Sequence, residues 1–337
     1  MKTTSISSQS VSTAMHLTVS NAQAEISKLQ KEAVTGTYSD VGVELGTRTS
    51  TSLDYTRESK RLQAIVDSNS VAEQRMDASQ LAMKNMSDSA QTLLNSVIAL
   101  SGNTDASSLG VAKTTAMSVL ENFTSYANTA VNGEFLFSGI NTDAQTLDDG
   151  FIGNITSNFK SAFDTAFPDP STASASDVAA FLQDYQDTFD WPSWTNASDT
   201  AMSSRISTSE TVSTSASANE SGFKNLVLAT VISSQLVDAG LGPDALSVVN
   251  DATTKLAGSA ISNIDTQRAK IGLSQERVEK ANTYMSAQKT IIDTQLTDLV
   301  GIDTYEASTR LTTLLNQVET SYTITSKIQG LSLVNFI

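Results

Sequence analysis

The strongest constraint on the fold of this chain is a run of apolar and small residues that recurs every three or four positions between residues 62 and 100. The run comprises Leu62, Ile65, Asn69, Ala72, Met76, Ser79, Met83, Met86, Ala90, Leu93, Val97 and Leu100. This spacing is typical of one face of a long α-helix that packs in a coiled coil. At about 1.5 Å per residue such a helix is on the order of 58 Å long. The segment therefore predicts long packed helices as the main element of the fold.

Other stretches of the chain carry the same spacing. After a break at residues 101–103 the pattern resumes over residues 109–130, which predicts two antiparallel helices joined by a short loop. Pro243 suits the first turn of a further helix. That helix repeats an apolar residue at every seventh position, namely Ile264, Ile271, Val278, Met285, Ile292 and Leu299. A last helix carries Leu311, Leu314, Val318, Tyr322 and Ile328.

The charge of the chain divides it into three parts. Residues 1–142, 143–221 and 222–337 have net charges of −3, −10 and −2, so two thirds of the total of −15 lies in the middle part. We therefore predict N-terminal helices over 1–142, an acidic variable middle domain over 143–221, and C-terminal helices over 222–337 that pair with the N-terminal segment. The fold class predicted is mainly α: a long antiparallel helical rod built from both chain ends, with an inserted mixed α/β middle domain.

The middle part mixes helical and strand-like patterns. Residues 154–167 and 177–189 place aromatic residues at helical spacing, and residues 205–216 alternate as a β-hairpin does. Trp191 and Trp194 flank Pro192 in this part. Such a pair suits either a carbohydrate platform or a small core, and we favour the core.

Composition excludes many kinds of functional site. The chain has no cysteine and one histidine, His16, so it has no disulfide and no multi-histidine metal site. It contains no recognisable catalytic motif, and we predict neither an enzyme nor a cofactor. The acidic balance disfavours nucleic acid and anionic membranes. Residues 1–10 are polar and no apolar run is long enough to span a bilayer, so we expect no cleaved signal peptide and no membrane segment.

Both ends of the chain carry apolar residues that a compact domain would leave partly unburied. The first helix has a thin stripe over residues 15–33, and five sizeable apolar residues fall within the last seven positions. Helices this sparse in large side chains gain stability mainly from packing against other elements. We predict an assembly interface formed by Met15, Val19, Ile26, Leu29, Leu331, Leu333, Val334, Phe336 and Ile337. We also expect the two ends to pair only when subunits assemble.

Three segments resemble the flagellin superfamily, and within it the hook-filament junction proteins of alphaproteobacteria. They are Leu29-Gln30-Lys31-Glu32-Ala33-Val34-Thr35-Gly36, Gly133-Glu134-Phe135-Leu136-Phe137-Ser138-Gly139-Ile140-Asn141-Thr142, and Leu331-Ser332-Leu333-Val334-Asn335-Phe336-Ile337. The resemblance identifies Gly133, Phe135, Leu136, Phe137, Ser138 and Gly139 as a junction motif. One departure is the segment Tyr38-Ser39-Asp40-Val41, which stands where many members have Ser-Asp-Asp-Pro.

This resemblance implies a structural protein of the bacterial flagellum that is exported without a cleaved signal peptide and located outside the cell. The partners implied are a hook-associated protein on the hook side, flagellin on the filament side, identical subunits in a ring and a cytoplasmic export chaperone. Flagellin, the filament subunit itself, is the alternative inside the family. A signalling coiled coil is the alternative from another class, but it usually requires a membrane anchor. An enzyme in the middle part is a third, although residues 143–221 contain no histidine for a metalloprotease.

Overall fold

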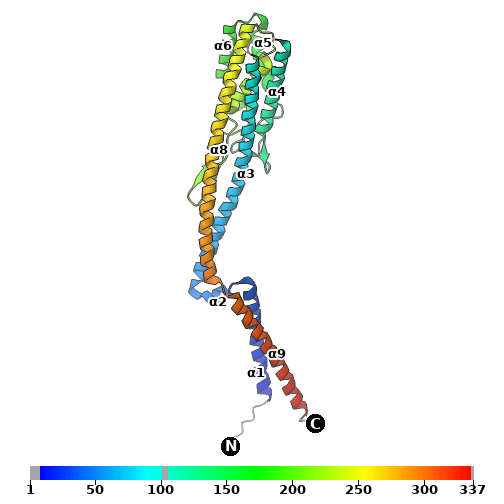
Figure 1. The fold of residues 1–337 in the computed structure, drawn as a ribbon, viewed down its shortest axis with the longest axis vertical. Coiled ribbons are helices and arrows are strands. Elements are labelled where there is room, and N and C mark those ends of the chain that lie inside the picture. The colour runs from blue at the N-terminus through cyan, green and yellow to red at the C-terminus, as the bar shows by residue number, and fades with distance from the viewer. Residues whose placement is uncertain (1–7, 101–104, 335–337) are drawn as a thin grey trace. The chain divides into compact units, whose positions relative to one another are not determined.

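The computed structural model describes residues 8–100 and 105–334, and they form a mainly α fold (Figure 1). Contacts divide the chain into two compact units. The first comprises Met1–Gln63 and Ser286–Ile337, and the second comprises Ala64–Met285. No helix among the described residues has the length and apolarity required to span a bilayer. The predicted fold class, mainly α with only small sheets, is confirmed.

The first unit is built around two antiparallel helices, one from each end of the chain. α1 (Ser8–Thr35) packs along α9 (Thr304–Val334), as Figure 1 shows. Between them in sequence lie α2 (Val41–Leu45), the 3-10 turn η1 (Gly46–Arg48), the first part of α3 (Thr49–Ala99) and the last part of α8 (Pro243–Val300). Within this unit Ser59 of α3 donates a hydrogen bond to Asp293 of α8 at 2.6 Å. That bond and the bond from Lys289 lower the pKa of Asp293, the lysine contributing more.

The second unit contains the remainder of α3 and α8 and all the shorter elements. These are α4 (Ala106–Ala127), β1 (Ala130–Val131), β2 (Glu134–Phe135), α5 (Phe151–Ala166), η2 (Pro170–Thr172), α6 (Ala175–Thr188), η3 (Trp191–Trp194), β3 (Ser203–Arg205), β4 (Thr211–Ser213) and α7 (Ser221–Leu236). β1 pairs with β2 and β3 with β4, each pair antiparallel. The helices and the hairpin predicted within residues 143–221 are confirmed as α5, α6 and β3 with β4. The division of the chain at 142 and 221 does not coincide with the two compact units and stays a prediction.

The predicted apolar stripe of α3 is confirmed. Every position of the run from residue 62 to residue 100 is buried except Ile65, which is half-buried. Asn69 is fully buried at one of these positions, where its amide donates to the Asn282 side chain of α8 at 2.7 Å and to the Ile206 carbonyl at 2.9 Å. A buried amide pair of this kind fixes the register of two helices. The heptad of α8 is confirmed as well, because five of its six residues are buried and Leu299 is half-buried.

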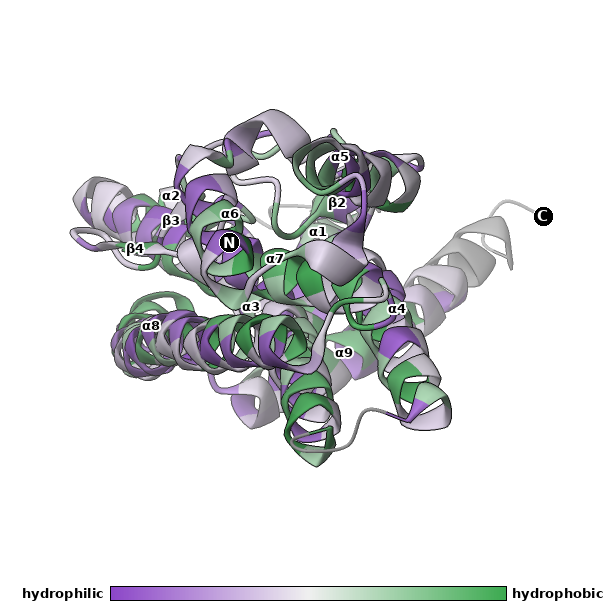
Figure 2. Ribbon diagram, turned by 90° about the horizontal axis from the view of Figure 1, so that it is seen from above, coloured by the Kyte–Doolittle hydropathy of each residue, from purple (hydrophilic) through white to green (hydrophobic). Residues whose placement is uncertain are grey.

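α7 is the most deeply buried helix of the second unit, and the sequence pattern did not single it out. It packs against α4 and α5 and is largely hydrophobic (Figure 2). Its buried residues are Gly222, Phe223, Leu226, Val227, Leu228, Ala229, Thr230, Val231, Ile232, Ser233, Ser234 and Leu236. A helix that is largely apolar and buried on most of its sides is the expected form of a central core element. Gly222 permits close packing on α8, since a Cβ at this position would lie 2.9 Å from the Ile264 side chain.

The two tryptophans of the middle part have different environments. Trp191 is 2% exposed, and its indole N–H donates to the Ala218 carbonyl at 2.8 Å. Trp194 is only half-buried and stacks on Phe189 with a centroid distance of 6.2 Å. The predicted core role is therefore confirmed for Trp191.

Tyr185 supplies a test of this aromatic packing. Burial raises the pKa of its phenol to about 12 from 10.0, so the folded chain keeps the proton at pH values where the unfolded chain has lost it. The stability of the fold should therefore fall as the pH rises from 10.0 to about 12. In Tyr185→Phe we expect a smaller fall, measured as the urea midpoint across that range. Tyr284→Phe, at an exposed position, is the control, and an equal fall in both variants would contradict the assignment.

Candidate assembly surfaces

The N-terminal half of the predicted assembly interface lies on the face of α1 that contacts α9. Leu29 is buried, and Met15, Val19 and Ile26 are half-buried. The Met15 sulfur accepts a hydrogen bond from the Thr325 hydroxyl at 3.4 Å. The single chain thus already contains this helix pair, contrary to the expectation that the ends pair only on assembly. Small seam residues on both helices allow this close packing with few large side chains.

The C-terminal half of the predicted interface is only partly described. Leu331, Leu333 and Val334 belong to α9, but their side chains lie outside the described part of the chain. Phe336 and Ile337 lie wholly outside the described residues. The interface role of all five residues stays a prediction.

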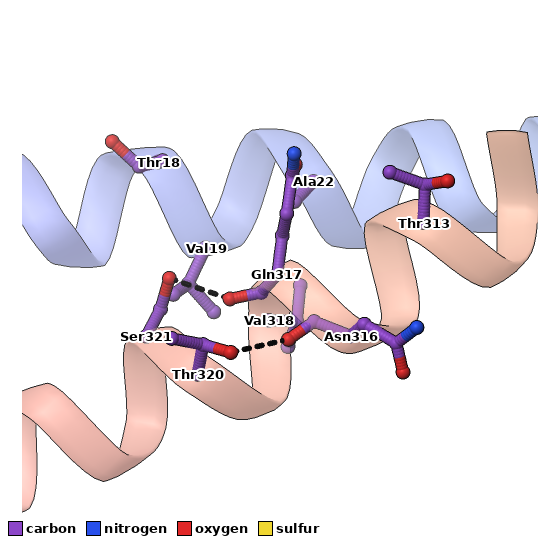
Figure 3. Close-up of a pocket in the computed structure, with 9 residues that line it drawn as sticks. All are labelled: Thr18, Val19, Ala22, Thr313, Asn316, Gln317, Val318, Thr320 and Ser321. Atoms are coloured by element: carbon purple, nitrogen blue, oxygen red, sulfur yellow. Dashed lines mark hydrogen bonds between the residues drawn. The ribbon is translucent and has the colours of Figure 1, made fainter.

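A shallow groove of about 540 Å³ runs between α1 and α9 (Figure 3). It is lined by Thr18, Val19, Ala22, Thr313, Asn316, Gln317, Val318, Thr320 and Ser321. Val19 reaches from α1 toward α9, and Gln317 reaches from α9 toward α1 beside Ala22. The Thr320 and Ser321 hydroxyls donate to carbonyl oxygens of their own helix, each at 2.8 Å, so their methyl and methylene groups remain to line the groove.

Outside this groove both helices expose large apolar side chains. Those that the sequence analysis did not assign are Leu17 and Val34 on α1 and Tyr305, Leu315 and Ile324 on α9. Tyr322, which the sequence analysis placed on the apolar stripe of the last helix, is 54% exposed instead. Leu315 is 47% exposed and follows directly on the seam residue Leu314. Because Leu314 and Leu315 are adjacent, the apolar stripe of α9 is one position wider than a simple heptad pattern. A search for apolar residues at heptad spacing alone does not find the second of the two.

The loops that end α1 and begin α9 are held together by backbone hydrogen bonds. The Ile302 N–H donates to the Gly36 carbonyl and the Tyr38 N–H to the Val300 carbonyl, each at 3.0 Å. Gly36 has a φ of 68°, which a glycine adopts without strain at the end of a helix. The register of α1 on α9 is thereby set at one end of the pair.

The segment that departs from the family pattern, residues 38–41, leads into α2 beside these loops. Asp40 caps the helix by accepting a hydrogen bond from the Val43 N–H at 3.1 Å. Glu44 of α2 accepts a hydrogen bond from Lys28 at 2.8 Å, and this bond is the main cause of the raised pKa of Lys28. Although carboxylates gather here, the described residues include no group of three or more arranged to hold a metal ion.

The predicted junction motif begins with a tight hairpin in the second unit. Asn132 and Gly133 both have positive φ, as the two central residues of a type I′ turn require, and they join β1 to β2. Phe135 is half-buried in β2. Glu134 extends from the hairpin to Arg75 of α3, with which it forms an ion pair.

The rest of the motif lies inside the second unit. Leu136 and Phe137 are at most 1% exposed, and the Phe137 ring packs on Phe223 of α7 at 5.4 Å. The Ser138 hydroxyl is fully buried and lies 2.9 Å from that of Thr146. Phe137 thus connects the end of β2 to α7, and Ser138 connects it to the segment that follows β2. In this chain Leu136, Phe137 and Ser138 therefore face the core of the second unit.

Gly139 is required where two backbone segments cross. Its φ is 64°, and a Cβ there would lie 2.4 Å from the Ser198 carbonyl oxygen and 2.7 Å from that of Thr200. The Ser198 N–H donates to the Ser138 carbonyl at 3.0 Å, which closes this contact. The motif therefore requires a glycine at this position for steric reasons.

Comparison with known proteins places both ends of the chain in one family. The family model of the bacterial flagellin N-terminal helical region matches residues 6–142, and that of the C-terminal helical region matches residues 254–337. Together the two matches cover well over half of the chain. The chain belongs to the flagellin superfamily. It is accordingly a structural component of the bacterial flagellum, an extracellular organelle.

The fold of this flagellin-family chain is similar to that of a solved flagellar protein. A putative flagellar hook-associated protein from Vibrio parahaemolyticus matches with a TM-score of 0.55 and 13% sequence identity, over 75% of this chain and 97% of that chain. No curated protein matches the sequence. At this identity the likeness concerns the fold, and it agrees with the helical organisation described above.

Proposed function

We propose that this chain is the hook-filament junction protein, flagellar hook-associated protein 3 of the alphaproteobacterial type. In this role it joins the hook-associated protein on the hook side to the first layer of flagellin. The observation that carries the proposal is the segment over residues 133–139, which resembles junction proteins and forms a hairpin followed by a buried connection to α7. The solved structure described as a putative flagellar hook-associated protein supports it, because that chain is covered almost completely.

The surface that we assign to assembly is the α1 and α9 pair. The exposed apolar residues on both helices and the groove between them offer a neighbouring copy a place to bury large side chains among small ones. Burial of apolar surface contributes about 25 cal/mol per Å². In the proposed ring of identical subunits this surface would be covered. In the cytoplasm before export, a dedicated chaperone would cover the same surface and Leu331, Leu333, Val334, Phe336 and Ile337.

Deletion of the gene tests the junction role directly. We expect cells with hooks but no filaments, and flagellin shed into the medium, because filament growth then lacks its base. Electron microscopy of the cells and analysis of the medium give the result. Filaments of normal length in the deletion strain would contradict the proposal.

Complementation of that strain tests the assembly surface. We expect Leu315→Asp to leave the stability of the purified chain within about 0.5 kcal/mol of the original, as usual for surface changes. It should nevertheless fail to restore filaments, since a neighbour would have to bury the new charge. Thr312→Asp is the control, because it adds the same charge at an exposed polar position of α9. Restored filaments with Leu315→Asp would exclude this surface.

Flagellin itself is the second candidate, because the two family models that match are those of the flagellin ends. The two roles predict very different amounts of protein. A filament subunit accumulates in great excess over a junction protein in isolated flagella. Quantitative mass spectrometry of sheared filaments with attached hooks distinguishes them.

A further inference from the structure

A row of nearly parallel aromatic rings crosses one face of the second unit. Tyr185 of α6 stacks on Phe189 with a centroid distance of 5.7 Å and an interplanar angle of 26°. Phe189 in turn stacks on Trp194 of η3 at 6.2 Å and 21°. Tyr185 and Trp194 are half-buried, whereas Trp191 is enclosed in the core. Two rings of the row, those of Tyr185 and Trp194, are therefore partly accessible to solvent.

Polar groups surround this aromatic surface and form an open cavity of about 460 Å³. Its lining consists of Asn158, Tyr185, Thr188, Phe189, Asp190, Ser193 and Trp194. This volume lies in the range of about 300–1,000 Å³ that small-molecule sites occupy. The cavity thus combines a stacking surface with a polar rim.

Several of the rim groups have hydrogen-bonding capacity to spare. The indole N–H of Trp194 and the carboxylate of Asp190 make no hydrogen bond with any described residue. Asp190 is the N-cap residue of η3, but its side chain makes no capping hydrogen bond. The Tyr185 hydroxyl donates to the Asn158 side-chain oxygen at 3.0 Å, which leaves the amide N–H groups of Asn158 turned to other acceptors. The rim therefore offers both hydrogen-bond donors and acceptors.

We propose that this cavity binds one neutral pyranose unit of a saccharide. The apolar C–H face of the sugar would stack on Trp194, and its ring hydroxyls would bond to Asp190 and Asn158. A pyranose presents one flat apolar face with hydroxyl groups around its edge, which matches an aromatic surface with a polar rim. The site goes beyond the structural role proposed above and is independent of it.

Two other ligand classes fit the cavity less well. An anion would meet the negative charge of residues 143–221, and the nearby Lys224 is engaged over the Phe189 ring at 5.9 Å. A quaternary ammonium ion is best held by rings that enclose it from several sides. The rings of Tyr185, Phe189 and Trp194 are instead close to parallel.

The test uses the purified full chain with maltohexaose, cellohexaose and chitohexaose as probes. The chain has two tryptophans, so the indole region of its ¹H–¹⁵N spectrum has two peaks to follow. We expect at least one saccharide to shift the Trp194 peak saturably, with a Kd of about 0.1–10 mM, an affinity ordinary for a small ligand in an open site. The peak of the enclosed Trp191 should stay in place. If none of the three probes shifts the Trp194 peak, the proposal is wrong.

Variants separate the stacking surface from the polar rim. Trp194→Ala removes the stacking ring and should weaken saccharide binding at least tenfold. The near-isosteric Asn158→Leu removes only the side-chain amide and should weaken binding at least threefold. Tyr284→Ala, which removes an exposed ring elsewhere in the unit, should leave the affinity unchanged. Circular dichroism shows whether each variant is folded. If Trp194→Ala does not fold, the affinity of Asn158→Leu for the saccharides still tests the proposal. Unchanged affinity in folded Asn158→Leu, or binding of tetramethylammonium or a polyproline peptide in place of the saccharides, would overturn the proposal.

Discussion

Met285→Asp is expected to destabilise the second unit by roughly 3 kcal/mol or more, within the range of severe core substitutions. Met285 is 1% exposed and belongs to the seven-residue repeat of α8. An aspartate there is either desolvated without a partner or protonated at a cost in free energy. The measurement is the free energy of unfolding in urea, followed by circular dichroism.

Tyr284→Asp is the matched control for this substitution. Tyr284 precedes Met285 on the same helix and is 69% exposed, so the same charge is placed in water. We expect a change within about 0.5 kcal/mol. Equal losses in the two variants would mean that helix propensity or net charge, not burial, determines the effect.

Gly139→Ala is expected to cost about 3 kcal/mol or more, although it adds a single methyl group. The new Cβ would lie 2.4 Å from a backbone oxygen of Ser198, so two backbone segments must separate and lose the hydrogen bond between them. The positive φ adds strain of roughly 1–2 kcal/mol for a residue that has a Cβ. Urea unfolding gives the loss directly.

Gly133→Ala separates the two contributions. Gly133 also has a positive φ, of 84°, but a Cβ there would meet no atom within 4 Å. Its substitution should therefore cost only the backbone strain of roughly 1–2 kcal/mol. A loss at Gly139 no larger than that at Gly133 would show that the crossing segments move apart without cost.

The helices of this protein were predictable because their signal is local. The apolar spacing of α3 and α8 follows from 3.6 residues per turn. It indicates which face of each helix is buried, and it does so without reference to the element that packs on that face. Pro243 likewise begins α8, as the geometry of a first helical turn favours. The resemblance of the three quoted segments predicted the flagellin superfamily. The family models of the flagellin N- and C-terminal helical regions confirm that prediction.

The sequence by itself thus determined the helical class, the buried faces of the long helices and the membership of the flagellin superfamily. Only the tertiary structure decided that the two ends pair within a single chain, that α7 is the central helix of the second unit, and that Phe137 packs on it. It also decided that Trp191 belongs to the core while Trp194 borders a cavity. The physical reason is that helix periodicity depends on residues three or four positions apart, whereas these contacts join residues far apart in the chain.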